Sequence, residues 1–228
     1  MNDNMEHISL ALPDQKNYEY SYGLALKLAG EKLTTFKDLE EQCRKSDSVY
    51  QNVGSQRAIL LKYLDRTYQI SLPDIVFSVK NSPEKVELRD KILILHYLTQ
   101  ARGTPLSNIK IAFKELKQGA SYFPTYFQRA VKPLIDFFGK SPEAILGLTT
   151  HMGGYKDTHG DIAVTVPAFS RVPITLVLWK GDDEFPPNAN ILFDSTILDY
   201  LSAEDVIILC QTISWRLVKS LQTRSNVS

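Results

Sequence analysis

Residues 160 to 205 read GDIAVTVPAFSRVPITLVLWKGDDEFPPNANILFDSTILDYLSAED, and this stretch decides the fold. Three runs in it have the β-branched and aromatic composition of strands, at 162–167, 173–179 and 190–193. An acidic turn, 180–187, joins the second run to the third. The motif Ser202-Ala203-Glu204-Asp205 then predicts a capped helix over 203–221.

The rest of the chain supplies further strands and helices around this stretch. Residues 58–64 and 67–72 predict a β-hairpin with the two-residue turn Asp65-Arg66, 74–79 extends it or pairs with it, and 109–116 alternates as a strand does. Helices are expected at 14–30, 36–44, 84–101, 123–138 and 141–151. They begin at caps such as Asp14, Thr35 and Ser82, and Pro133 should kink or split the fourth.

Strands therefore come in neighbouring groups separated by groups of helices. This order predicts an α+β fold with a largely antiparallel sheet packed with several helices, as one globular domain over residues 1–228. A Rossmann-like parallel sheet is the alternative. Residues 1–13 and 222–228 are expected to be loose ends.

Net charge excludes a strong global attraction to nucleic acid or anionic lipid, because Lys plus Arg and Asp plus Glu both number 26. Residues 180–205 hold seven acidic residues against one lysine, so a basic protein is a possible partner for this segment.

Cys43 and Cys210 form no metal-ligand spacing, and no secretory signal is apparent. We expect two reduced thiols in a cytoplasmic protein, with Cys210 buried in a helix. No apolar run approaches the ~20 residues needed to span a membrane.

Several motifs resemble a known family, the domain of unknown function 3786. They are HYL at 96–98, SYFP at 121–124, GD at 160–161, PI at 173–174, WKGDDEFPP at 179–187, ILFD at 191–194 and LSAED at 201–205. The resemblance covers roughly 84–221. Members occur mainly in anaerobic bacteria and archaea, and some are fused to iron–sulfur modules, which hints at anaerobic cofactor metabolism. This chain lacks such a cysteine-rich module.

Two groups of residues are candidates for chemistry. Asp182, Asp183, Glu184 and Asp194 offer the oxygen ligands that Mg²⁺ or Ca²⁺ prefers. A turn at Gly181-Asp182 and a helix cap at Asp194 explain them without a metal, and we favour this explanation because no standard metal loop is matched. His96, next to Tyr97 in an apolar helix, can ligate a metal or the metal of a tetrapyrrole, act as a base, or be a hydrogen-bonded core histidine.

The loop 151–161 carries His151, Asp157, His159 and Asp161 around a Gly-Gly pair. It suits a surface loop, or a lid or Zn²⁺ site using both histidines. The chain has no GxSxG, GxGxxG or P-loop motif, which leaves no obvious nucleophile or phosphate cradle. Aromatic residues between 122 and 138 suit a core, or a pocket for a flat ligand.

Three hypotheses follow. The first is a binding or accessory protein for a corrinoid or other tetrapyrrole, held between the helix of His96 and the acidic turn by His96, Tyr97, Trp179, Asp182, Asp183, Glu184 and Asp194. The second is a divalent-metal hydrolase with Asp182, Asp183 and Asp194 as ligands and His96 as general base. The third is a structural protein-interaction module.

Overall fold

The computed structural model describes residues 15–53 and 56–225, and it confirms the α+β class. One half of its sheet contains β5 (Lys110–Ala112), β6 (Tyr155–Asp157), β7 (Ile162–Phe169), β8 (Val172–Trp179) and β9 (Asn188–Asp194). The three strands predicted from 160–205 are β7, β8 and β9. The other half contains β1 (Val49–Val53), β2 (Gln56–Tyr63), β3 (Arg66–Leu72) and β4 (Val76–Val79). The predicted hairpin is β2–β3. β1 lies in a segment where no strand was predicted, and β6 lies within the loop predicted at 151–161.

The two halves form one sheet in the order β4-β3-β2-β7-β8-β9-β5, with β1 paired to β2 and β6 paired to β7. Every pairing between these strands is antiparallel. The predicted antiparallel sheet is therefore correct, and the parallel alternative is wrong.

A single residue pair, Tyr63 with Phe169, joins β2 to β7 at the seam between the halves. Aromatic rings cross this seam. The Phe169 ring stacks on Tyr63 with centroids 4.8 Å apart and on Tyr97 at 4.1 Å, and Tyr97 lies 5.9 Å from Tyr200. All four side chains are buried, so the seam lies in the hydrophobic core.

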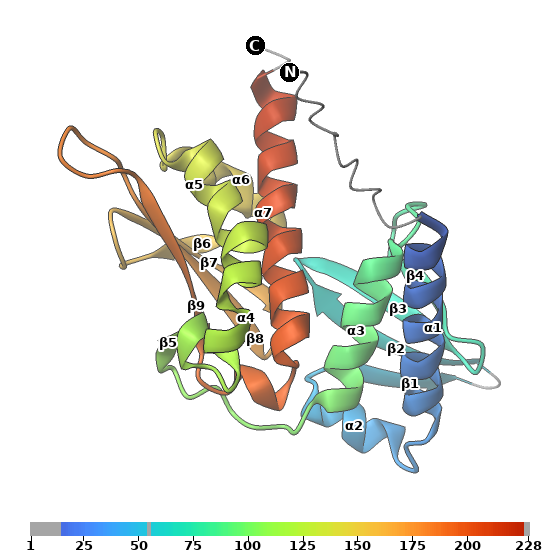
Figure 1. The fold of residues 1–228 in the computed structure, drawn as a ribbon. Coiled ribbons are helices and arrows are strands. Elements are labelled where there is room, and N and C mark those ends of the chain that lie inside the picture. The colour runs from blue at the N-terminus through green and yellow to red at the C-terminus, as the bar shows by residue number, and fades with distance from the viewer. Residues whose placement is uncertain (1–14, 54–55, 226–228) are drawn as a thin grey trace, which may run out of the picture.

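Helices cover one face of each half (Figure 1). In front of β1–β4 lie α1 (Gln15–Thr34) and α3 (Leu88–Gln100), with α2 (Leu39–Lys45) below them. In front of β7–β9 lie α4 (Gly119–Tyr126), α5 (Lys132–Phe138) and the long α7 (Ala203–Ser225), while α6 (Ala144–Thr149) contacts α7 and β7. None of the helices described is long and apolar enough to cross a bilayer.

Several predicted helix boundaries are wrong. α1 continues through Gly30, which lies against Ile75, and the cap assigned to Asp14 falls outside the described residues. Thr35 does not start α2. Its hydroxyl donates back to the carbonyl of Lys32, and Asp38 caps α2 by accepting from the amide of Glu41 at 2.8 Å.

The predicted cap Ser82-Pro83-Glu84 makes a turn instead, and α3 begins only at Leu88. The Ser82 hydroxyl accepts from the amide of Glu84, and the guanidinium of Arg66 binds Ser82 and Glu84 from β3. These bonds hold the segment against the sheet.

The strand predicted at 109–116 ends after Ala112. Phe113 turns inward and stacks on Tyr126 with centroids 4.0 Å apart, while Glu115 accepts from the Ala112 amide at 2.6 Å. The helix predicted at 123–138 starts at Gly119 and is split, as Pro133 indicated, by a π-helical segment Phe127–Val131 directly before α5. α6 follows close to its prediction, and residues 222–225, expected to be loose, complete α7.

Candidate functional site

His96 lies on α3 and binds a carboxylate from the first turn of α7. Its Nδ1 is 2.6 Å from Oδ1 of Asp205, which is 109 residues away in the chain. The other oxygen of Asp205 accepts from the Ser202 hydroxyl at 2.7 Å and from the side-chain amide of Gln100 at 3.1 Å. Gln100 is one helical turn after His96, so both reach Asp205 from the same face of α3.

The predicted N-terminal cap of α7 fixes the position of the Asp205 carboxylate. The Ser202 hydroxyl accepts from the Asp205 amide at 3.1 Å, and Asp205 accepts from the Ser202 amide at 3.2 Å, which is a reciprocal capping arrangement. The Asp205 side chain is 5% exposed, and burial opposes its ionisation. The bonds from His96, Ser202 and Gln100 outweigh burial and hold the pKa of Asp205 below its usual value.

Tyr97, the neighbour of His96, points into the core. Its hydroxyl donates to the carbonyl oxygen of Ser46 at 2.6 Å, its ring stacks on Phe169, and burial raises its pKa. The structure thus separates the two adjacent residues, with His96 at the surface and Tyr97 inside.

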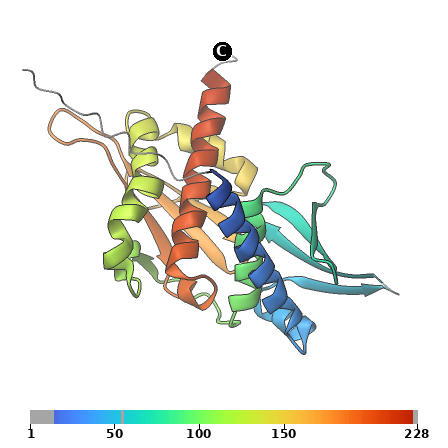
Figure 2. The same ribbon diagram turned by 45° about the vertical axis from the view of Figure 1, so that its right-hand side comes forward.

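The acidic turn between β8 and β9 is held by its own backbone. Asp182 accepts from the amides of Glu184 at 2.9 Å and Phe185 at 2.7 Å, while Asp183 and Glu184 are exposed. This is an Asx turn. Figures 1 and 2 both show the turn projecting from the body of the molecule, well away from α3. The structure therefore does not bring His96 and the acidic turn together.

Asp194, at the end of β9, anchors a loop. Its carboxylate accepts from the amides of Ser107, Asn108 and Thr196 and from the hydroxyls of Ser107 and Thr196, at 2.7–3.1 Å. Burial opposes ionisation, but these bonds lower the pKa of Asp194. Within residues 15–53 and 56–225, no group of three or more His, Cys, Asp or Glu side chains is placed to hold a metal ion.

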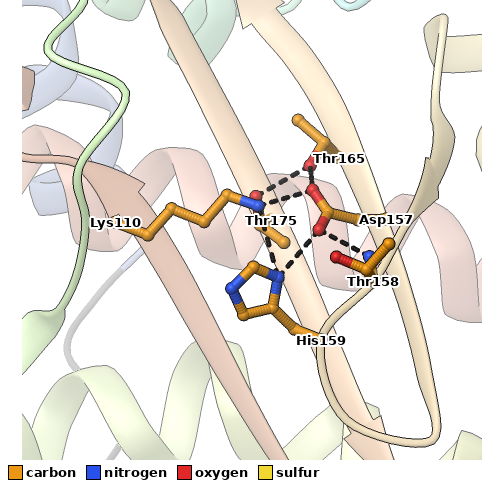
Figure 3. A network of polar contacts seen from close by, with 6 residues as sticks. All are labelled: Lys110, Asp157, Thr158, His159, Thr165 and Thr175. Carbon is orange, nitrogen blue, oxygen red and sulfur yellow. Dashed lines mark hydrogen bonds and ion pairs between the residues drawn. The ribbon is translucent and has the colours of Figure 1, made fainter.

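A second polar network lies on the face of the sheet opposite the helices (Figure 3). Asp157 of β6 accepts from Lys110 Nζ of β5 at 2.5 Å, from the Thr165 hydroxyl of β7 at 2.6 Å, and from its neighbour's amide. Nδ1 of His159 lies 2.8 Å from Oδ1 of Asp157, the oxygen that also accepts from the Thr158 amide, whereas Lys110 and Thr165 contact Oδ2. The Thr165 hydroxyl is 2.8 Å from that of Thr175 on β8. Burial opposes ionisation, yet these donors hold the pKa of Asp157 far below its usual value.

The loop predicted at 151–161 presents His159 to this network, and the network includes no contact from His151. Gly160, with φ of +59°, lets the loop approach β8: a Cβ there would lie 2.6 Å from Cγ1 of Val177 and 3.3 Å from the Trp179 ring. Asp161 accepts from the amide of Lys180 at 2.9 Å. The motifs GD and WK, which carried the family resemblance, therefore meet in space.

Lys110, Thr165 and Thr175 are members of this network that the sequence did not predict. Thr165 and Thr175 both interrupt apolar strands, but a hairpin turning at residues 170–171 would by itself pair Thr165 with Leu176. The bulge between Pro167 and Phe169 shifts the register and brings the two threonines together, and the sequence did not predict it. Lys110 could not be found from local signals, since its partner Asp157 is 47 residues away on a strand that was taken for a loop.

Two comparisons with characterised proteins gave no match, neither among curated proteins nor among solved structures. The family model described as domain of unknown function DUF3786 matches residues 38–216, which include α2, the nine strands found in the described residues, the cap of α7, His96 and the Lys110 network. The match begins earlier than the sequence resemblance, which started near residue 84. It spans well over half of the 228 residues, and the chain therefore belongs to the DUF3786 family.

Proposed function

We propose that the protein binds a metal-bearing cofactor, of the corrinoid or other tetrapyrrole class, through Nε2 of His96. The observation that carries the proposal is the 2.6 Å contact between Nδ1 of His96 and the buried carboxylate of Asp205. Histidines that ligate metals commonly donate their other ring N–H to a carboxylate, which fixes the tautomer and makes the ligating nitrogen more basic.

The same contact leaves one imidazole nitrogen for a ligand. Asp205, with its lowered pKa, is ionised near neutral pH and takes the Nδ1 proton as a hydrogen bond, so the lone pair of the neutral ring is on Nε2. The His96 side chain is 31% exposed, so the ring is not enclosed in the core.

A hollow in the surface adjoins this network at Ser202. The hollow has a volume of about 450 Å³. Its lining includes Ser202, the cations Arg102 and Lys117 and the carboxylates of Asp199 and Glu204, but not His96. Arg102 also binds Asp199 at 3.1 Å. Lys117 suits a carboxylate group at the edge of a tetrapyrrole, and a macrocycle bound to His96 would extend beyond the hollow over the surface. The proposal rests on His96 and its support, and it needs no contribution from Tyr97 or the acidic turn.

Visible absorption spectroscopy tests the proposal, with cobalamin and haem each added to excess protein. We expect a shift of the cofactor's spectrum in the wild type and its loss in His96→Ala. Asp205→Asn should weaken binding by about 10- to 100-fold, as loss of the carboxylate bonded to a metal-ligating histidine generally does.

His159→Ala is the matched control, because His159 is also bound to a carboxylate, Asp157, but on the other face of the sheet. It should bind like the wild type. An unshifted spectrum with both cofactors, or the same shift in His96→Ala as in the wild type, would refute the proposal.

A further inference from the structure

A pocket of about 400 Å³ lies where the first half of α1 and the start of α3 approach the middle of α7 (Figures 1 and 2). α7 lines it with four residues spaced i, i+3, i+4 and i+7, namely Thr212, Trp215, Arg216 and Lys219. This spacing puts all four on one face of the helix. Nη2 of Arg216 is 2.5 Å from the carboxylate of Asp90, in the first turn of α3, so this face of α7 is turned to the start of α3. Side chains of the two helices therefore meet at one pocket.

Two cations of the lining have no carboxylate partner. Arg216 is compensated by Asp90. Arg89 of α3 and Lys219 of α7 are exposed, and neither forms an ion pair with a carboxylate of the described residues. Two such cations on facing helices match a phosphate monoester, which carries a charge of about −1.5 to −2 near neutral pH.

The start of α3 adds to this attraction for an anion. No side chain caps its first turn, so the positive end of the helix faces the same pocket. Glu87, the N-cap residue, is an exposed carboxylate in the lining. Its charge disfavours a second anionic group, and its oxygens can accept hydrogen bonds from hydroxyl groups. A ligand with one phosphate and several hydroxyls fits this wall.

Trp215 offers a surface for a planar ring. Its indole is 42% exposed and meets the Phe137 ring edge to face, with centroids 6.4 Å apart. Lys219 lies one helical turn after Trp215, so one ligand can reach the ring and the ammonium group together. Tyr22 of α1, half-buried, supplies a second aromatic side chain to the lining. Stacking on such rings is favourable beyond the area that it buries.

We propose that this pocket binds a nucleoside monophosphate, with its phosphate at Arg89 and Lys219, its base against Trp215 and its sugar hydroxyls towards Glu87. The volume is within the 300–1,000 Å³ typical of ligand sites and lies near the lower limit, as a single nucleotide requires. The pocket shares no lining residue with the hollow beside Ser202, so this inference does not depend on the cofactor proposal.

Tryptophan fluorescence tests the inference, since the chain holds only two tryptophans, Trp179 and Trp215. Trp179→Phe leaves Trp215 as the sole emitter. Trp215→Phe leaves Trp179, at the end of β8, as the control. At least one of AMP, GMP, CMP and UMP should change the Trp215 emission saturably, and none should change the Trp179 emission in this way.

Calorimetry with the wild type then separates the parts of the ligand. The nucleoside of the tightest nucleotide lacks the phosphate, and ribose 5-phosphate lacks the base. Each should bind at least about tenfold more weakly than the nucleotide, because each gives up either the charged hydrogen bonds or the stacking.

Arg89→Gln and Lys219→Gln test the phosphate contacts. Each should weaken nucleotide binding about tenfold, the effect of one hydrogen bond to a charged group, and leave binding of the nucleoside unchanged. Lys62→Gln is the matched control. Lys62 of β2 is also exposed and forms no ion pair with the described residues, so its variant should bind like the wild type.

No saturable response of Trp215 to any of the four nucleotides would overturn the inference. Equal affinity for the nucleoside, or for inorganic phosphate, would also overturn it, because recognition would then lack either the phosphate or the base. Effects of Arg89→Gln and Lys219→Gln no larger than that of Lys62→Gln would do so as well.

Discussion

The ammonium group of Lys110 lies 2.5 Å from Oδ2 of Asp157, and this contact joins the two edge strands of one half of the sheet. Between β5 and β6 lie β9, β8 and β7, and in a flat sheet four spacings of about 4.8 Å would separate the edges by roughly 19 Å. A lysine side chain cannot bridge that distance. The sheet must therefore curl, and the ion pair fastens its concave face.

Removing Lys110 should destabilise the fold more than removing a surface lysine. Lys110→Met leaves the 13%-exposed Asp157 without its ammonium partner, and we expect a loss of about 1.5–3 kcal/mol, as for hydrogen bonds to charged groups. Lys132→Met, which breaks the exposed pair with Asp136, should cost no more than about 1 kcal/mol. Urea unfolding measures both, and equal losses would contradict a bracing role for Lys110.

The lowered pKa values of Asp157, Asp194 and Asp205 predict loss of stability in acid. Each group has a lower pKa folded than unfolded, where an aspartate titrates near about 3.9. Its contribution is fully present above that pH and declines as the pH falls towards the folded pKa. The stability difference between wild type and Asp194→Asn should therefore shrink below about pH 4. A difference that stays constant down to unfolding would contradict this assignment.

Gly160→Ala should displace the loop that carries His159. The new Cβ meets Val177 at a positive φ, and we expect a loss of about 1–3 kcal/mol with altered Trp179 emission in the Trp215→Phe background. Gly23→Ala is the control. Its Cβ meets nothing within 4 Å in α1, so it should stabilise by up to about 1 kcal/mol. A neutral Gly160→Ala would show that the loop yields without strain.

Arg216 and Asp90 should respond unequally to mutation. Nη2 of Arg216 is 2.5 Å from Oδ2 of Asp90, and the Tyr63 hydroxyl donates to the other oxygen at 3.0 Å. Arg216→Met strands a 6%-exposed carboxylate and should cost about 3–5 kcal/mol. Asp90→Asn should cost less, because an amide still accepts from Tyr63 and the 32%-exposed guanidinium can turn to water. Thermal melts measure both variants, and a lower melting temperature for Asp90→Asn than for Arg216→Met would contradict this prediction.

Local signals in the sequence predicted local structure well. The β7–β8 hairpin and the cap formed by Ser202 and Asp205 each depend on residues close together in the chain. The acidic turn shows the limit of such signals. Asp182 and Asp194 have the composition of a metal site, but neighbouring backbone amides satisfy both, and the sequence supports either outcome.

Long-range partnerships were beyond the sequence. The partner of His96 is Asp205, 109 residues away, because α3 passes the first turn of α7. The helix pattern predicted that both elements exist but not that they touch. Lys110 and Asp157 meet only because the sheet curls, and curvature is a property of five strands together rather than of any one of them.

The joint at Tyr63 and Phe169 has a consequence for how the two halves tolerate change. When two hydrogen-bonded strands shift their register by one residue, every side chain moves to the other face of the sheet, so only shifts of two residues keep the core side chains in the core. Stacked rings, such as those of Tyr63, Phe169 and Tyr97, can slide by a fraction of their width at small energetic cost. An insertion or a slipped register in β1–β4 would thus be absorbed at the rings instead of being transmitted to β7–β9. Each half can vary its own strands while the other keeps its geometry.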